Sequence, residues 1–294
     1  MGFPNINGKT RVCGLFGFPV EHSFSPAMHN AAYAKLGLNW VYVPYGVHPD
    51  RLAQAMEGIR SLELTGVNVT VPHKQNILPL LDEIDPAARI IGAVNTIVNE
   101  GGKLVGYNTD GPGFIRSLET EAGFSPRGKS ILLVGAGGAA RAVAIALAFA
   151  GADSLYITNR TPERAEGLAR DVSRACQVKA RVLPWGKQLP RTTVSEVNLV
   201  VQTTSIGMSP GVDQAPEFPF TALRPGQLVC DLIYNPAKTL FLQRAAAQGA
   251  KTFNGLGMLL YQGVLAFELW TGLPAPVEIM RETLLRQVSG REER

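Results

Sequence analysis

Short apolar runs and stretches of helical periodicity alternate along the first hundred residues. The apolar runs predict strands at residues 12–18, 40–47, 66–71, 93–98 and 103–107. Helices are predicted from Ser25 to about Gly37, with Ser25 as the capping hydroxyl and Pro26 at the first position, and over residues 50–61. The glycine-containing residues 99–102 predict a hairpin turn. This alternation indicates an α/β domain with a mostly parallel sheet.

A second alternation of strands and helices begins after residues 125–128, which are typical of a turn. Strands are predicted at 130–134 and 155–158 and near Val178, Leu199 and Leu228, and helices at 139–150 and from Pro162. Repeated strand–helix units are typical of a doubly wound, Rossmann-type sheet. Two last helices, at 258–270 and 276–288, are expected to pack back on the first domain.

The chain therefore predicts an α/β fold with two domains. An N-terminal substrate domain spans residues 1–109 and is completed by the C-terminal helices in 255–294, and a nucleotide-binding domain spans 110–254. A length of 294 residues suits two domains of ordinary size. A content of 46% hydrophobic and 18% charged residues is that of a globular protein.

Charge and cysteine content narrow the class of protein. The net charge of +4 is spread along the chain, which suits anionic ligands and argues against a nucleic-acid partner. Cys13, Cys176 and Cys230 have no metal spacing and predict free thiols in a reducing compartment. No secretory signal or membrane-spanning run is visible, so we expect a soluble cytoplasmic protein, a monomer or a homodimer, without a membrane partner.

The four histidines give no indication of a metal site. They lack the spacing of metal ligands, and we expect them to cap helices or lie at the surface. They are His22, His29, His48 and His73.

A glycine-rich segment lies between the strand predicted at 130–134 and the helix that follows. It reads Gly135-Ala136-Gly137-Gly138-Ala139-Ala140. Glycines at such a turn let a pyrophosphate approach the backbone N–H groups of the helix N-terminus. The segment therefore predicts a dinucleotide site.

The strand predicted next ends without the carboxylate that usually holds the ribose of NAD. Asn159, Arg160 and Thr161 follow it, and Arg164 lies one turn into the next helix. Two guanidinium groups can bind a 2′-phosphate, so NADP is predicted rather than NAD.

Polar residues follow several predicted strands of the first domain. Taken singly, each is more often a cap or a turn than a site. In sequence order with later segments, however, they resemble the shikimate dehydrogenases from about residue 14 to 262. The matching motifs are S-x-S-P at 23–26, N-V-T-V-P-x-K at 68–74, G-A-V-N-T at 92–96, N-T-D-G at 108–111, G-A-G-G-A at 135–139, N-R-T at 159–161, and N-G-L-G-M at 254–258 with Gln262.

The resemblance implies reduction of 3-dehydroshikimate to shikimate by NADPH, a step of chorismate and aromatic amino acid biosynthesis. Lys74 and Asp110 match the catalytic pair, with Lys74 as the acid–base residue in our hypothesis. Positions expected to bind substrate are Ser23, Ser25, Asn68, Thr70, Lys74, Asn95, Asp110, Tyr234 and Gln262. Positions expected to bind the cofactor are Gly135, Ala136, Gly137, Gly138, Ala139, Asn159, Arg160, Thr161, Arg164, Thr204, Leu232, Gly255 and Met258.

Two positions depart from the family pattern, both beside the expected cofactor site. Gln202 replaces the usual asparagine, and Leu232 stands where many members have methionine. Tyr234 and Lys238 also match the Tyr-x-x-x-Lys spacing of another reductase class. That spacing needs a helix, which Pro236 argues against.

Two alternatives stay open at this point. A quinate/shikimate dehydrogenase of dual specificity, using NAD or NADP, resembles the chain as well. A non-catalytic sensor of a shikimate-pathway metabolite would keep the fold without turnover, although it would not need Lys74, Asp110 and the glycine-rich segment.

Overall fold

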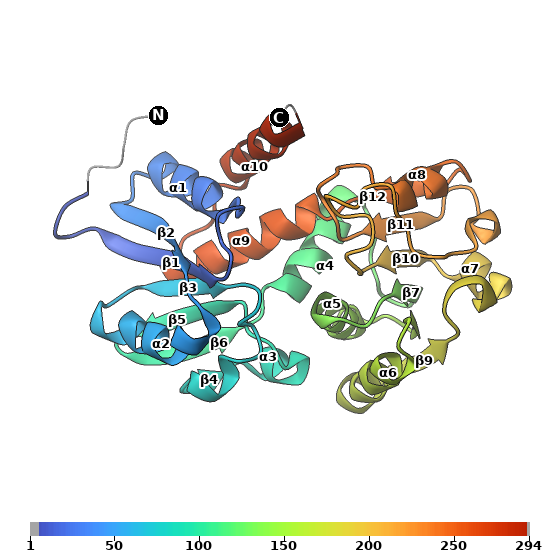
Figure 1. Cartoon of the computed structure of the whole chain (residues 1–294), viewed down its shortest axis with the longest axis horizontal. Coiled ribbons are helices and arrows are strands. Elements are labelled where there is room, and N and C mark those ends of the chain that lie inside the picture. The colour runs from blue at the N-terminus through green and yellow to red at the C-terminus, as the bar shows by residue number, and fades with distance from the viewer. Residues whose placement is uncertain (1–5, 293–294) are drawn as a thin grey trace. The chain divides into compact units, whose positions relative to one another are not determined.

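The computed structural model describes residues 6–292, and it divides into two compact units. The first unit contains the chain up to Thr109 and again from Leu260, and the second runs from Asp110 to Leu259 (Figure 1). Within the described residues each unit is built around one six-stranded sheet. These two sheets, in which parallel pairs predominate, confirm the predicted α/β class.

The sheet of the first unit has the strand order β2-β1-β3-β5-β6-β4. Its strands are β1 (Arg11–Gly17), β2 (Trp40–Gly46), β3 (Gly66–Val69), β4 (Glu83–Ile84), β5 (Thr96–Glu100) and β6 (Lys103–Tyr107). β1 is parallel to β2 and β3, whereas β5 is antiparallel to β3 and β6. Glu100 pairs with Lys103, which confirms the predicted hairpin.

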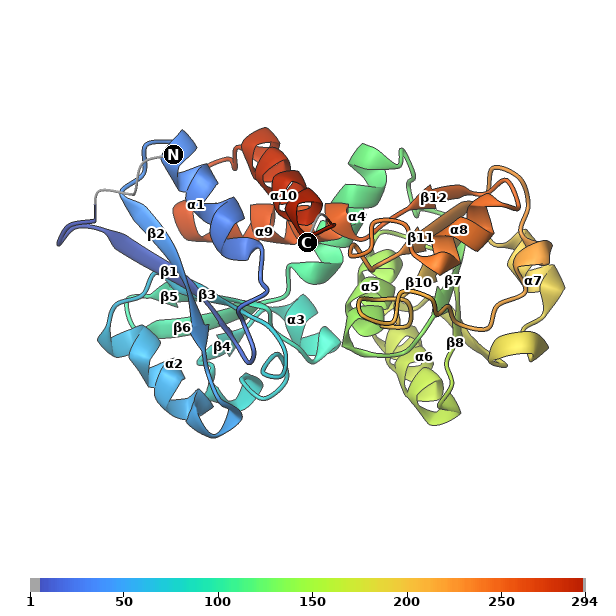
Figure 2. The same cartoon turned by 45° about the horizontal axis from the view of Figure 1, so that its top comes forward.

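Helices cover both faces of this sheet (Figures 1 and 2). The helices of this part of the chain are α1 (Ser25–Lys35), η1 (Pro49–Arg51), α2 (Leu52–Ser61), η2 (Leu78–Leu80), α3 (Pro86–Ile91), α9 (Leu256–Thr271) and α10 (Val277–Glu292). Met56 and Ile59 of α2 pack with Val67 and Ile97 in one buried cluster. On the other face the Trp270 indole of α9 donates to the Ile97 carbonyl at 2.9 Å. Both faces of the sheet are therefore buried.

The start of α1 differs from the sequence prediction. Phe24 occupies the N-cap without a side-chain cap, and Ser25 is already the first helical residue. The Ser23 hydroxyl accepts the Ser25 N–H at 3.2 Å. Ser25 as the capping hydroxyl was therefore wrong, because Ser23 supplies the local acceptor and Ser25 is buried.

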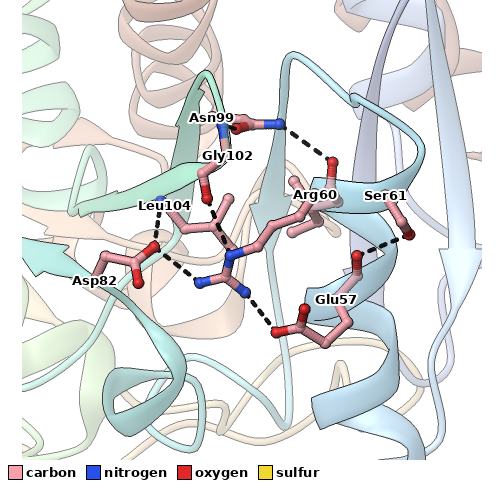
Figure 3. A network of polar contacts seen from close by, with 8 residues as sticks. Glu57, Arg60, Ser61, Asp82, Asn99, Gly102 and Leu104 are labelled. Atoms are coloured by element: carbon pink, nitrogen blue, oxygen red, sulfur yellow. Dashed lines mark hydrogen bonds and ion pairs between the residues drawn. The ribbon is translucent and has the colours of Figure 1, made fainter.

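A cluster of polar contacts ties α2 to the β5–β6 hairpin (Figure 3). Arg60 contacts the Glu57 carboxylate at 2.7 Å, that of Asp82 at 2.8 Å and the Gly102 carbonyl at 3.0 Å. Asp82 also accepts the Leu104 N–H at 2.7 Å. Hydrogen bonds from the Leu104 N–H and Arg60 hold the pKa of Asp82 below its ordinary value. We call these residues the Arg60 cluster.

The second unit contains a fully parallel sheet with the order β12-β11-β10-β7-β8-β9. Its strands are β7 (Ser130–Val134), β8 (Ser154–Thr158), β9 (Lys179–Leu183), β10 (Leu199–Gln202), β11 (Leu228–Asp231) and β12 (Lys251–Phe253). Counted from β7 in chain order, this arrangement is 3-2-1-4-5-6, the order of a Rossmann sheet. The strand order reverses between the parallel neighbours β7 and β10, the position at which such sheets bind dinucleotides.

The helices of this unit are α4 (Asp110–Glu121), α5 (Gly138–Phe149), α6 (Pro162–Cys176), η3 (Gly186–Gln188), α7 (Arg191–Glu196), η4 (Phe220–Ala222) and α8 (Leu240–Ala246). The helix α4, which was not predicted from the sequence, begins at Asp110 and contains Pro112 in its first turn. A Cβ on Gly111 would lie 2.7 Å from the Ala142 carbonyl oxygen, so this glycine allows α4 to pack closely on α5. No helix in residues 6–292 is long and apolar enough to cross a membrane.

Candidate active site

Polar side chains gather at one edge of the first sheet. The parallel strands β1 and β3 end there, and the antiparallel strand β5 begins there, so Asn68 of β3 pairs with Thr96 of β5. Thr96 in turn pairs with Tyr107 at the end of β6. Residues from three strand ends are thus placed side by side.

Buried hydrogen bonds join these side chains. The Tyr42 hydroxyl donates to Asn68 Oδ1 at 2.8 Å, and Asn68 Nδ2 donates to the Asn95 carbonyl at 3.2 Å and to Thr96 Oγ1 at 3.1 Å. Burial raises the pKa of the Tyr42 phenol, and the nearby Ser25 side chain opposes that shift. Asn68 is therefore held in one orientation by groups from other strands.

Asn95 connects these hydrogen bonds to Thr109, the last residue before the second unit begins. Its Oδ1 accepts the Thr109 N–H at 2.7 Å, and its Nδ2 donates to Thr109 Oγ1 at 2.9 Å. Asn95 thereby fixes the residue that immediately precedes Asp110. We call the set of Ser25, Tyr42, Asn68, Asn95, Thr96 and Thr109 the polar-edge network.

Three members of this network, Tyr42, Thr96 and Thr109, were not among the predicted site residues. Tyr42 lies inside a strand, where an aromatic residue indicates core packing. Its hydroxyl bond to Asn68 crosses from β2 to β3, which are not adjacent in the sheet. Only the tertiary arrangement could reveal this contact.

Four other predicted substrate positions are not members of the network. Ser23 and Thr70 are half-buried, and a Cβ on Gly17 would lie 2.3 Å from Thr70 Cγ2. Lys74 is half-buried in the turns after β3, and its carbonyl accepts the Val94 N–H at 2.8 Å. Gln262 is buried on α9. All these residues belong to the first unit.

Two histidines contradict the prediction of capping or surface positions. His29 is fully buried, stacked on Tyr42 with ring centroids 4.5 Å apart, and both of its ring nitrogens lack a hydrogen-bond partner in the described structure. Burial lowers the pKa of His29 to about 3. His73 is also buried, with Nε2 2.7 Å from the Val47 carbonyl oxygen. The aromatic neighbours of His29 come from distant segments, so the local pattern gave no sign of its burial.

In the second unit, the glycine-rich segment connects β7 to α5. Gly135 has φ +118°, and a Cβ there would lie 2.4 Å from Thr203 Oγ1. Gly137 is the N-cap of α5 and Gly138 its first residue, and a Cβ on either would enter open space. The segment thus offers free space at a helix N-terminus, which fits the pyrophosphate of a dinucleotide. Ala136 and Ala139 complete this turn.

The end of β8 carries the residues predicted to select the phosphorylated cofactor. Arg160, Thr161 and Arg164 are exposed, and Asn159 is half-buried. A cavity of about 760 Å³ lies there, with lining residues that include Asn159, Arg160, Trp185 and Lys187. Lys187 is a cation that sequence analysis did not single out. The cations at this strand end fit a phosphate group beside the ribose.

Gln202, the departure from the family pattern, is buried at the end of β10. Its Nε2 donates to the Thr204 and Ile206 carbonyls, both at 3.2 Å, and to Asp231 Oδ1 at 3.3 Å, and its Oε1 accepts the Thr204 N–H. Thr239 donates to Asp231 Oδ2 at 2.7 Å. Burial raises the pKa of Asp231 to about 6. These contacts join the loop of Thr204 to the loop after β11.

The loop after β11 also meets the start of α9. A Cβ on Gly255 would lie 1.8 Å from the Leu232 carbonyl oxygen, so two predicted cofactor positions are in backbone contact. Met258 follows on α9, half-buried. Residues 232–239, including the half-buried Tyr234, are not helical. Tyr234 and Lys238 therefore do not form the helical pair considered above.

Comparisons with known proteins agree with this arrangement. The model described as "Shikimate dehydrogenase substrate binding domain" matches residues 15–97, "Shikimate / quinate 5-dehydrogenase" matches 119–205, and "Shikimate 5'-dehydrogenase C-terminal domain" matches 255–285. A shikimate dehydrogenase (NADP(+)) from Desulforamulus reducens is 66% identical over 98% of this chain and 99% of its own.

Solved structures extend the likeness to three dimensions. A shikimate dehydrogenase in complex with NADP+ is 45% identical, with a TM-score of 0.88 over 96% of this chain and 97% of its own. Shikimate 5-dehydrogenase from Listeria monocytogenes in complex with shikimate and NAD is 40% identical, with a TM-score of 0.91 over 95% and 98%. The chain belongs to the shikimate dehydrogenase family.

Proposed function

We propose that this chain catalyses the reversible, NADPH-dependent reduction of 3-dehydroshikimate to shikimate, a step toward chorismate and the aromatic amino acids. The observation that carries the proposal is the 66% identity to a shikimate dehydrogenase (NADP(+)) along nearly the whole of both chains. The motif residues carried over from the family stand at strand ends, in loops and on helices of the two units.

Lys74 and Asp110 are the catalytic residues in this proposal. Lys74 acts as the acid–base group at the carbonyl oxygen, where its ammonium meets the negative charge that develops during reduction. Asp110 orients that ammonium. Support comes from Asn95, which holds Thr109 by two hydrogen bonds and so fixes the backbone leading into Asp110.

Substrate binding is assigned to polar groups of the first unit together with Tyr234. Ser23 and Ser25 suit the carboxylate because hydroxyl groups donate hydrogen bonds to it, and Asn68, Thr70, Asn95 and Gln262 suit the ring hydroxyls. The polar-edge network supports this assignment, since it fixes side chains before a ligand arrives and lowers the entropy lost on binding.

NADPH supplies the hydride when bound. The glycine-rich segment would hold its pyrophosphate, and Arg160 and Arg164 its 2′-phosphate. Thr204, Leu232, Gly255 and Met258 would line the nicotinamide side.

We further propose a cytoplasmic enzyme, a monomer or a homodimer. The three free cysteines, Cys13, Cys176 and Cys230, support a reducing compartment.

The test of the reaction is nicotinamide absorbance with purified protein, crossing NADP+ and NAD+ against shikimate and quinate. Turnover mainly with NADP+ and shikimate is expected. Comparable rates with quinate or NAD+ would instead assign dual specificity. Binding of shikimate without turnover in any combination would support the sensor.

The test of the catalytic role is the Lys74→Ala variant. We expect kcat to fall at least about a thousandfold, within the range that acid–base catalysis contributes. Lys238→Ala is the matched control, because Lys238 is exposed and belongs to the rejected Tyr-x-x-x-Lys spacing. Near-normal turnover of Lys74→Ala, or a comparable loss in Lys238→Ala, contradicts the assignment.

A further inference from the structure

A second cavity of the second unit lies at the edge of the sheet where its strands begin. Its volume is about 510 Å³. Residues around it include Lys129, just before β7, Asn198, just before β10, and Lys251, the first residue of β12. The glycine-rich segment leaves β7 at the other end, about 16 Å away along a strand of this length. The cavity is therefore distinct from the expected cofactor site.

The lining of this cavity carries charge of one sign. Arg127, Lys129, Arg224 and Lys251 contribute four cations, and the lining contains no aspartate or glutamate. A hollow lined by like charges raises the local concentration of counter-ions. We call these four residues the basic rim.

The charged groups of the basic rim are not paired with other groups of the described protein. All four side chains are exposed, and in the described part of the chain none of them has a salt bridge or a side-chain hydrogen bond. The Arg60 cluster shows the alternative, since that guanidinium is held by two carboxylates and a carbonyl.

Helix C-termini also face this edge, and cations often stabilise them. Ala122 and Gly123, just after α4, line the cavity. If helix capping explained the basic rim, its N–H groups would donate to those last carbonyls. In residues 6–292 no such bond from the rim occurs.

Neutral donors complete the cavity. Asn198 Oδ1 accepts the Ser130 N–H at 3.0 Å, which fixes the amide and leaves its Nδ2 group without a hydrogen bond among the described residues. Gln227 is buried beneath, where its side chain bonds the Val194 and Val197 carbonyls, both at 2.8 Å. These bonds hold the loop that carries Arg224, whose N–H donates to Gln227 Oε1 at 3.0 Å.

We propose that this cavity is a binding site for a small anion with at least two phosphate groups, separate from the cofactor site. Two guanidinium groups can each bind a phosphate through paired hydrogen bonds, and two ammonium groups add charge without demanding one geometry. The volume falls within the range of ordinary small-molecule sites, about 300–1,000 Å³. Inorganic polyphosphate and phosphorylated metabolites share this chemistry.

The test is calorimetric titration of the full chain, saturated with NADP+ so that the glycine-rich segment is occupied, using tripolyphosphate as the probe. Saturable binding of one tripolyphosphate per chain is expected. In the double variant Arg127→Gln/Arg224→Gln the Kd is expected to rise at least about tenfold, the loss of one charge-assisted hydrogen bond or more. Fructose 1,6-bisphosphate, titrated in the same way, distinguishes a metabolite site from one for inorganic polyphosphate.

Arg174→Gln/Lys179→Gln is the matched control, because both cations are exposed on the same unit outside the cavity. The control is expected to bind like the parent protein. An equal loss in the control, or no saturable binding by the parent, overturns the site. Citrate, a small trianion without phosphate, overturns the choice of phosphate if it binds as tightly as tripolyphosphate. Shikimate turnover of the rim variant, measured alongside, tests the proposed reaction separately.

Discussion

The two units present polar groups in opposite ways. In the first unit, the side chains of Asn68 and Asn95 are buried. The Asn68 amide donates a hydrogen bond to the Asn95 carbonyl, and the Asn95 amide donates one to the Thr109 hydroxyl. In the second, the expected cofactor site consists of glycine backbone, open space beside Gly137, and the exposed cation Arg160. The expected substrate-binding asparagines are therefore part of the buried core of the first unit, whereas the expected cofactor site lies at the surface of the second unit.

Because of this difference, substitutions in the two units should affect different quantities. A change in the polar-edge network removes buried hydrogen bonds and so should lower both folding stability and activity. Replacement of an arginine at the end of β8 removes a solvent-exposed charge, and it should alter cofactor affinity without altering folding stability. Four substitutions test that separation.

The largest effect is expected for Asn95→Leu. The substitution leaves the Thr109 N–H and hydroxyl without their partner, at about 3 kcal/mol of unfolding free energy for the lost bonds together. It also frees the residue before Asp110, and kcat/KM for shikimate should fall at least about a hundredfold, an apparent loss near 3 kcal/mol. Urea unfolding and steady-state kinetics measure the two effects.

Asn99→Leu is the control for this variant. Asn99 lies at the other end of β5, donates to the Ile59 and Leu64 carbonyls at 3.2 and 2.9 Å, and accepts the Gly102 N–H at 2.7 Å (Figure 3). It should lower stability similarly while kcat/KM of the folded fraction stays unchanged. Equal losses of activity in both variants would show that the network has no special role at the site.

Arg160→Gln should have the next largest effect. Loss of one guanidinium from the 2′-phosphate is expected to raise KM for NADPH about tenfold or more, and to leave KM for NADH and the melting temperature unchanged. Arg174→Gln, an exposed arginine of α6, is the control. An equal rise for NADH would mean that Arg160 contacts something other than the phosphate.

His29→Phe tests the buried imidazole. Unfolded His29, with an ordinary pKa near 6.5, binds a proton as pH falls, whereas the folded residue, with a pKa of about 3, does not. Stability from this residue is therefore present above pH 6.5 and is lost below it, by about 1.4 kcal/mol between pH 7.5 and 5.5. The variant should lack this loss in urea unfolding at the two pH values.

Subtracting the pH dependence of stability of the His29→Phe variant from that of the parent protein isolates the contribution of His29, because both proteins contain Asp231. The pKa of that carboxyl is raised to about 6, so its contribution has the opposite sign and declines as pH rises from 3.8 to 6. An identical pH dependence of the two proteins would show that His29 is accessible to water.

Arg60→Ala should have the smallest effect. The carboxylates it contacts are largely exposed, and exposed ion pairs contribute little. We expect the melting temperature to fall by less than about 3 °C and kcat to stay unchanged. A large loss of activity would mean that the far end of the hairpin influences the polar-edge network.

Most of the architecture could be predicted from sequence because its signals are local. Strands such as β7 are short apolar runs, and the glycine-rich segment follows one directly. Asn68 and Asn95 were identified through the motifs that contain them, and the structure places them side by side. The two-sheet α/β class was confirmed.

What the sequence pattern missed depends on contacts between distant segments. His29 has a polar ring on a short helix, and its burial depends on Tyr42 and Trp270. The helix α4 begins with Asp110-Gly111-Pro112-Gly113, which locally predicts a turn. Proline is tolerated in a first helical turn, and Gly111 is needed for packing against α5.

The arrangement of the chain in the first unit has a consequence for synthesis on the ribosome. The Trp270 indole of α9 donates to the carbonyl of Ile97, which lies 173 residues earlier in the chain. One face of the first unit's sheet therefore lacks its contacts with α9 until α9 has emerged from the ribosome. The second unit is continuous from Asp110 to Leu259 and has all its residues earlier. Domains usually fold in the order in which they are translated. Here the second unit can complete its fold first, while the N-terminal strands wait with one apolar face exposed, a state that chaperones would recognise.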